Sequence, residues 1–181
     1  MKHLITTLAF AATALGSAQA ATYQAVVPEK SSVTFSYKQM GVAMDGKFKK
    51  FSAQISSLDT AKPGNAKGSI DIDLASIDTG SSEVDQEVVG KAWFNVAAHP
   101  KASFVLKGLK ATGANQYEAT GQLTIKGQTR ELHAPLKLSP QGALTGSFVL
   151  KRGDYGIGEG MWAKFDVVAN EITVNFNLNL K

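Results

Sequence analysis

The residues best suited to acid–base or metal chemistry are few in this sequence. His99 and His133 are the only histidines after His3, and neither belongs to an HxxxH or HxH pair. A histidine metal site would therefore have at most two ligands, far apart in sequence. His99 precedes Pro100 in an expected loop, and His133 falls on the polar face of an expected strand. We interpret both as surface side chains rather than ligands or catalytic bases.

Other catalytic motifs are absent or incomplete. The sequence has no GxSxG nucleophile elbow and no cysteine, which excludes disulfides and thiolate metal sites. The glycine-rich segment 156–160 lacks the strand–turn–helix setting and glycine spacing of a phosphate-binding loop. Asp71, Asp73 and Asp78 do not have the spacing of a twelve-residue calcium loop. We therefore expect no enzyme activity, no metal and no cofactor.

The N-terminus has the features of a secretory signal peptide. A weakly basic start is followed by the apolar stretch 4–15, and Ala18-Gln19-Ala20 supplies the small-x-small cleavage pattern. The stretch is shorter than the ~20 apolar residues that span a bilayer. We expect residues 1–20 to be removed and residues 21–181 to form one domain. Export and the lack of cysteine predict a periplasmic protein.

The charge pattern argues against nucleic acid as a partner. The net charge of +4 becomes +3 when Lys2 leaves with the signal peptide. The densest basic group is Lys47, Lys49 and Lys50, which could attract anionic head groups or form a solvated strand face. No basic stripe with interleaved aromatic residues is present, so single-stranded nucleic acid is not an expected ligand.

Alternation of apolar and polar residues dominates the sequence after residue 22 and predicts antiparallel strands with one wet face. Short turn segments separate these runs and favour sequential hairpins. The pair Lys49-Lys50 interrupts the alternation, and a β-bulge there would keep Phe48 and Phe51 on the inner face. The clearest runs are 32–38, 68–74, 117–125, 130–138, 144–150 and 172–180.

One segment, residues 81–91, lacks the two-residue period. Ser82 and the acidic residues that follow it are typical of a helix N-terminus, so we expect one short α-helix covering an end of the sheet. About eight strands with frequent glycines favour closure into a single antiparallel up-and-down β-barrel, because closure removes exposed edges. Patterning alone leaves a two-sheet sandwich open.

The expected inner face combines aromatic rings with small residues. Such a face either fills the barrel completely or leaves an apolar pocket, which is the usual form of a ligand site. Composition permits a lipid cavity without requiring one. The residues we expect to line it are Val33, Phe35, Tyr37, Phe48, Phe51, Ile70, Ile72, Phe104, Ala119, Gly121, Leu123, Leu136, Phe148, Trp162, Val174 and Phe176.

Several motifs, in order along nearly all of residues 21–181, resemble those of the YceI family of lipocalin-like periplasmic proteins. The resemblance implies an elongated barrel with a long apolar tunnel that holds a polyprenyl chain, a quinone tail or a fatty amide, and no catalysis. The matching stretches are SVTF at 32–35, GKFKKF at 46–51, SIDT at 76–79, WFNV at 93–96, GQLTIKG at 121–127 and the R-x-x-Y-G-I-G stretch at 152–158.

Two departures from the family pattern affect the expected head-group site. Gln39 stands where many members carry histidine, and the family's R-D-x-H-L helix start keeps only Asp85. We carry over Arg152 as a contact for an anionic or carbonyl head group, with Tyr155 beside it. The alternative is an ion pair between Arg152 and Asp154 or Glu159.

These observations predict periplasmic binding, transport or storage of a polyisoprenoid or isoprenoid quinone. A ligand-free stress or interaction protein and a scavenger of amphipathic toxic compounds such as antibiotics are the alternatives. An enzyme would need an unrecognised acid–base pair. The expected partners are the lipid and, transiently, a membrane or a membrane cytochrome, with the chain a monomer or homodimer.

Overall fold

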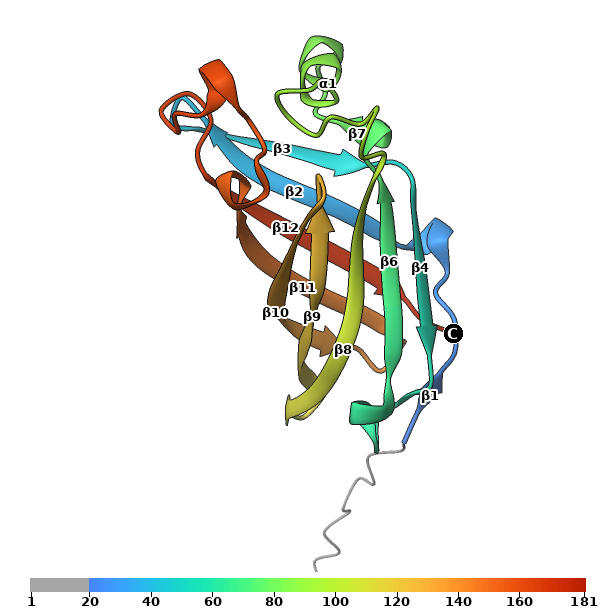
Figure 1. The fold of residues 1–181 in the computed structure, drawn as a ribbon. Coiled ribbons are helices and arrows are strands. Elements are labelled where there is room, and N and C mark those ends of the chain that lie inside the picture. The colour runs from blue at the N-terminus through green and yellow to red at the C-terminus, as the bar shows by residue number, and fades with distance from the viewer. Residues whose placement is uncertain (1–19) are drawn as a thin grey trace, which may run out of the picture.

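Alternating apolar residues produce one curled antiparallel sheet of ten strands in the computed structural model, which describes residues 20–181 (Figure 1). A second sheet of two strands and one α-helix complete the main elements. The predicted all-β fold with one short helix is confirmed. The predicted signal peptide lies outside the described residues apart from Ala20, and it stays a prediction.

The strands follow one another mainly as hairpins. The order across the large sheet is β4-β6-β8-β9-β10-β11-β12-β2-β3-β7, and β1 pairs with β5 in the small one. The strand bounds are β1 Thr22–Tyr23, β2 Ser32–Gln39, β3 Val42–Phe48, β4 Phe51–Ser56, β5 Leu58–Asp59, β6 Lys67–Asp73, β7 Ile77–Asp78, β8 Lys101–Gly113, β9 Gln116–Ile125, β10 Gln128–Leu138, β11 Ala143–Lys151 and β12 Glu171–Asn179.

The first long strand and the last strand of the chain lie side by side. Phe35 of β2 is opposite Val174 of β12, and Val33 is opposite Phe176. This pairing joins the β8–β12 meander to β2 and β3, and it requires side chains far apart in sequence to share one inner face. The strict period of two in both strands fixes this register, because a one-residue slip would turn every apolar side chain outward.

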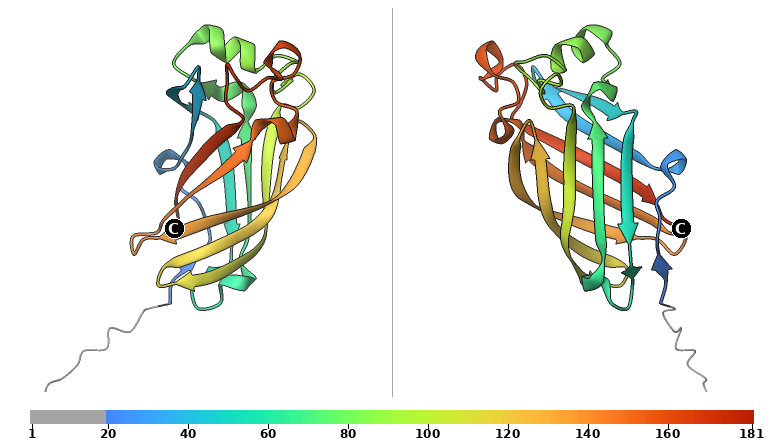
Figure 2. Two further views of the ribbon diagram at one scale, coloured as in Figure 1. Left: turned by 90° about the vertical axis from the view of Figure 1, so that its left-hand side faces the viewer. Right: turned by 45° about the vertical axis from the view of Figure 1, so that its right-hand side comes forward.

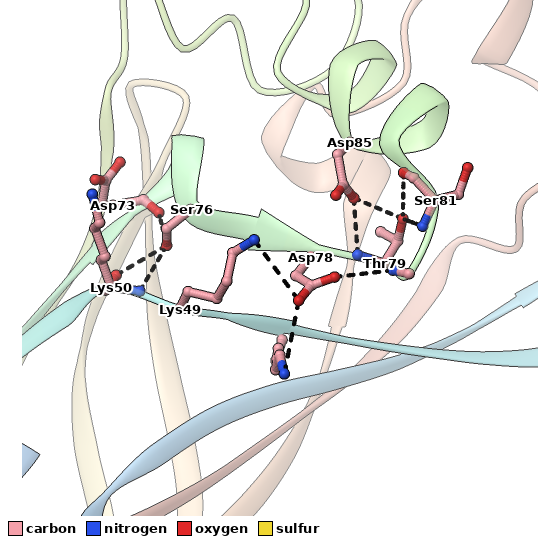
Figure 3. A network of polar contacts seen from close by, with 10 residues as sticks. Lys49, Lys50, Asp73, Ser76, Asp78, Thr79, Ser81 and Asp85 are labelled. Carbon is pink, nitrogen blue, oxygen red and sulfur yellow. Dashed lines mark hydrogen bonds and ion pairs between the residues drawn. The ribbon is translucent and has the colours of Figure 1, made fainter. Parts of the chain in front are cut away.

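The sheet has ten strands rather than the expected eight because two predicted strands are each broken in two. Lys49 and Lys50 separate β3 from β4, and the 3₁₀ turn Leu74–Ser76 separates β6 from β7. Hydrogen bonds bridge these breaks: Lys49 N donates to Ser76 O at 3.0 Å, and Asp73 N donates to Lys50 O at 3.1 Å. Ser76 is buried, and its Oγ also accepts from Lys50 N at 2.9 Å (Figure 3).

The sheet curls into a half-barrel whose edge strands are β4 and β7. These edges are covalent continuations of β3 and β6, so the curl brings the two ends of the strand order together (Figure 2). A two-sheet sandwich, which patterning left open, does not form, because the ten main strands belong to one sheet.

The predicted helix forms as α1, Ser82–Val88, and lies over one end of the half-barrel (Figure 1). Ser81 is its N-cap, with Oγ accepting from Val84 N at 3.5 Å. Asp85 ties the helix to the segment after β7, accepting from Thr79 N at 2.8 Å and Thr79 Oγ1 at 2.7 Å (Figure 3). Within residues 20–181, no helix is long and apolar enough to cross a membrane.

Two buried apolar clusters fill opposite parts of the half-barrel. One contains Leu58, Leu109 and Leu138, and the other, nearer α1, contains Leu74 and Trp93. Leu58 and Leu74 are only 1 % exposed. The two clusters pack the strands together at the two ends of the half-barrel.

Candidate ligand-binding cavity

A cavity of about 450 Å³ runs through the interior of the half-barrel, and its lining contains members of both apolar clusters. This volume lies within the range of small-molecule sites. Most of the lining is aliphatic or aromatic. Its exposed members are Glu83 and Glu87 of α1 and Gln54 of the edge strand β4, so the cavity reaches the surface under α1 and along that edge.

All but two of the expected lining residues do line this cavity. Apart from Trp162, which lies in the connection between β11 and β12, they alternate along strands, so the inner face predicted from the two-residue period is the face that surrounds the space. They are Val33, Phe35, Tyr37, Phe48, Ile70, Ile72, Phe104, Ala119, Leu123, Leu136, Phe148, Trp162, Val174 and Phe176.

Gly121 is the first of the two that do not line it. The ring of Phe104 occupies the position where a Cβ on Gly121 would lie. The same arrangement seats Phe35 on Gly46, its cross-strand partner. Gly121 and Gly46 therefore accommodate aromatic rings rather than leaving room for a ligand, whereas Gly68 does line the cavity.

Phe51 is the second. Phe48 remains at the cavity, with its ring 5.4 Å from Phe35 and 6.4 Å from Phe94. Beyond the Lys49-Lys50 break, Phe51 instead packs against the buried cluster at the other end of the half-barrel. The break differs from the simple bulge that was expected, because it divides the strand and separates the environments of the two rings.

The segments without a strand period supply lining residues that pattern analysis did not identify. Trp93 and Phe94 follow α1, and Ile157 and Val168 belong to the long connection between β11 and β12. Trp93, Phe94 and Ile157 lie within motifs quoted above, which are the only sequence signal that pointed to this region, whereas Val168 lies in none of them. Together with Val88 they close the space beneath α1.

Trp162 connects the two sides of the cavity mouth. Its Nε1 donates to Glu87 Oε1 of α1 at 2.9 Å, and its ring centroid lies 5.4 Å from that of Trp93. The contact spans α1 and the connection between β11 and β12. We call this hydrogen bond the mouth contact.

Arg152 is 1 % exposed and organises the connection that follows β11. Its guanidinium lies 5.3 Å from the ring centre of Trp93 and 4.8 Å from that of Phe165. All five of its N–H donors are directed at backbone oxygens. These are Ala169 O at 3.2 Å, Ile157 O at 2.8 Å, Gly158 O at 3.3 Å, Trp162 O at 2.8 Å, Lys164 O at 3.3 Å and Val168 O at 2.8 Å.

This geometry corrects both expectations for Arg152. No donor is left for a ligand head group, although the side chain borders the cavity. Within residues 20–181, neither Asp154 nor Glu159 forms an ion pair with it; Glu159 pairs with Lys126 at 3.1 Å. Burial lowers the pKa of Arg152 because desolvation disfavours the charged form.

Tyr155 is also buried, at 4 % exposure, but it packs in the apolar cluster near α1 and does not line the cavity. Burial raises the pKa of its hydroxyl, partly offset by Arg130, whose guanidinium lies 5.9 Å from the ring centre. The proposed head-group role of Tyr155 therefore has no support from its position.

The polar groups of the lining near α1 include both acceptors and donors, among them the buried indole N–H of Trp93, which has no hydrogen-bond partner within the described residues. The charged residues of the lining are Glu83, Glu87 and the fully hydrogen-bonded Arg152. Tyr37 and Gln39 extend the inner face of β2 to this end. Burial, together with the negative charge of Asp85, raises the pKa of the Tyr37 hydroxyl.

The histidines lie away from the cavity. On the outer face, His133 contacts Thr120 Oγ1 through Nδ1 and Glu131 Oε1 through Nε2, both at 3.1 Å. This order of groups resembles a catalytic relay, but His133 and Glu131 are exposed and outside the cavity. No cluster of three or more potential metal ligands exists within residues 20–181.

Comparison with known proteins identifies a family. A model described as the YceI-like domain matches residues 24–180. A UPF0312 protein of Azotobacter vinelandii is 28% identical over 170 residues, covering 87% of this chain and 88% of its own. A UPF0312 protein of Pseudomonas putida is 32% identical over 130 residues, covering 67% of each chain.

Solved structures share the fold. The crystal structure of Burkholderia cenocepacia BcnA matches with a TM-score of 0.81 and 36% identity, over 84% of this chain and 98% of that one. A polyisoprenoid binding domain from Saccharophagus degradans, implicated in plant cell wall breakdown, matches with a TM-score of 0.65 and 17% identity, over 88% and 97%.

Proposed function

This chain belongs to the YceI-like family, and on that premise we propose that it binds one long-chain apolar lipid inside its half-barrel. The observation that carries the proposal is the apolar cavity beneath α1, whose one basic side chain, Arg152, already donates all its hydrogen bonds to the backbone. A space of this kind offers little to a small polar ligand.

Burial of methylene groups would supply the binding free energy. Each CH₂ removed from water contributes about 0.8 kcal/mol, so affinity rises with the number of carbons inside the cavity. We expect chain length to determine affinity more strongly than the head group does. The solved polyisoprenoid binding domain has the same fold, which supports an isoprenoid chain as the first ligand class to test.

The biological setting in this proposal is the periplasm, where the protein would carry or store a polyisoprenoid or isoprenoid quinone. The signal-peptide pattern of residues 1–20 supports this location. Fractionation of the host cells tests it, and retention of the full-length chain in the cytoplasm would contradict it.

Native mass spectrometry of protein purified from its host tests the ligand. We expect a co-purifying lipid whose mass corresponds to an isoprenoid chain. A protein that carries no lipid and binds none when offered polyprenyl compounds would favour the ligand-free alternative. Preferential capture of antibiotics over such chains would favour the scavenger alternative.

A matched pair of variants tests whether the lipid binds in the cavity. Ala119 lines the space and is 4 % exposed, whereas its neighbour Glu118 is exposed on the outer face of the same strand. Ala119→Phe should abolish lipid binding, and Glu118→Phe should leave it unchanged. Should Ala119→Phe not fold, Ala119→Val gives the smaller version of the same test. Equal binding by a folded Ala119 variant and the Glu118 variant would refute the cavity site.

A further inference from the structure

Large apolar side chains are exposed in two loops at the end of the half-barrel that carries α1. One is the turn between β2 and β3 together with Val42, the first residue of β3, and the other belongs to the connection between β11 and β12. We call these five side chains the apolar rim. They are Met40 at 76 % exposure, Val42 at 61 %, Met161 at 85 %, Phe165 at 46 % and Val167 at 38 %.

The two loops are joined to each other and to the cavity mouth. Met40 N donates to Val167 O at 2.7 Å, and Gln39 forms a β-bridge with Val168. Gln39 and Val168 line the cavity, as does Trp162, the neighbour of Met161. In Figures 1 and 2 the connection between β11 and β12 lies beside the tip of β2 and β3, at the same end as α1. The rim is therefore continuous with the mouth.

The charges near the rim are mixed in sign: exposed Lys38 lies two residues before Met40, and exposed Glu159 lies two residues before Met161. Lys164 and Asp166 flank Phe165 and balance each other. Across the mouth, α1 contributes Glu83 and Glu87 to the lining and has no basic residue of its own. Attraction at this end must come from apolar burial, and Met and Phe side chains suit insertion among lipid chains.

We propose that the apolar rim docks on a lipid bilayer and places the cavity mouth at its surface. The proposal rests on the proposed function, because it assigns the route by which an apolar chain enters. Methylene groups that pass directly between bilayer and cavity avoid exposure to water, which would otherwise oppose transfer in proportion to chain length. The bilayer is thus the occupant that fits both the rim's chemistry and its position.

Vesicle flotation tests the docking. Wild-type protein should float with vesicles of phosphatidylcholine and phosphatidylethanolamine, and about equally with vesicles that also contain phosphatidylglycerol. High salt should not release it. Met40→Asn/Met161→Ser should lower the vesicle partition coefficient about tenfold or more. Asn suits the positive φ of 49° at residue 40.

Four exposed valines give a matched control. Val42 and Val167 belong to the rim, whereas Val105 and Val149 lie on strands of the wall, at 42 % and 57 % exposure. Val42→Ser/Val167→Ser should weaken vesicle binding, and Val105→Ser/Val149→Ser should not. Equal loss in both pairs, or release by salt, would overturn the docking proposal.

The remaining outcomes separate this proposal from the function itself. A wild-type protein that holds lipid in its cavity but never binds vesicles refutes the rim's role and leaves the function standing. A dimer that forms without vesicles and dissociates in Met40→Asn/Met161→Ser would assign the rim to a second copy, which also overturns docking. Vesicle binding that depends on the rim, with a cavity that takes up no lipid, would support docking and refute the proposed function.

Discussion

The ring of Phe104 lies directly against the Cα of Gly121, and no Cβ fits between them. An added Cβ would also come within 2.5 Å of Val105 O, which is backbone and cannot rotate away. We therefore predict that Gly121→Ala lowers the free energy of unfolding by about 2 kcal/mol, within the usual range for overpacking. Urea unfolding monitored by tryptophan fluorescence measures this loss.

Gly108 provides the control for that substitution. It lies in β8, beside β9, and a Cβ there would meet no atom within 4 Å. Gly108→Ala should leave stability within a few tenths of a kcal/mol or raise it slightly, because alanine restricts the unfolded chain. In addition, Phe104→Leu should recover part of the loss caused by Gly121→Ala, since the two residues are in contact. Additive effects would mean that the ring does not sit on the glycine.

The contact between Phe104 and Gly121 also shows what could and could not be predicted from the sequence. The two-residue period places Phe104 and Gly121 on the inner face correctly, because strand geometry fixes which side each Cβ faces. The period does not say whether the space beside a glycine holds solvent, ligand or a neighbouring ring. That outcome depends on rotamers and on the diagonal neighbours across two strands.

The break at Lys49-Lys50 could likewise be predicted only in part. Sequence identified the place where alternation fails, but the outcome depends on the opposite strand, where a 3₁₀ turn supplies Ser76 to continue the hydrogen bonding. Arg152 was selected correctly as unusual, yet its six carbonyl partners come from a connection with no periodic signal. The alternation of apolar and polar residues does not predict the conformation of irregular segments such as this connection.

Arg152 should prove essential for stability rather than for head-group recognition. Arg152→Lys offers three donors on a flexible stem in place of a planar fork with five, so several buried carbonyl groups lose their partners. We expect a loss of about 3 kcal/mol or more in the free energy of unfolding, measured by urea denaturation. A lysine variant that is as stable as wild type but binds lipid weakly would instead restore the head-group interpretation.

Asp78 should make stability depend on pH. The backbone N–H of Gly80 donates to Asp78 Oδ1 at 3.1 Å, and Lys47 and Lys49 lie 3.7 and 3.8 Å from Oδ2 (Figure 3). The hydrogen bond from Gly80, and then the two lysines, hold the pKa of this carboxyl below its usual value of 3.8. A lowered folded-state pKa stabilises the protein above the unfolded pKa, and this contribution is lost as pH falls through the folded value.

Asp78→Asn should therefore lower the melting temperature at neutral pH, and the difference from wild type should shrink below about pH 4. Thermal unfolding across that range, followed by circular dichroism, measures it. Asp71→Asn is the comparison, because Asp71 has a single exposed ion pair with Lys101 at 3.8 Å and should show a smaller effect. A constant difference between Asp78→Asn and wild type at every pH would contradict the assignment.

The mouth contact between Trp162 and Glu87 should govern how fast ligand leaves. Trp162→Phe removes the N–H donor while keeping an aromatic ring against Trp93. An exposed hydrogen bond to a carboxylate contributes about 1 kcal/mol, so lipid release should accelerate about fivefold with little change in melting temperature. Stopped-flow dilution of protein loaded with a fluorescent polyprenyl probe into excess vesicles measures the release rate. Glu87→Gln, which keeps an acceptor for the indole, should release more slowly than Trp162→Phe. Unchanged release in Trp162→Phe would show that α1 and the β11–β12 connection do not need this contact to retain the chain.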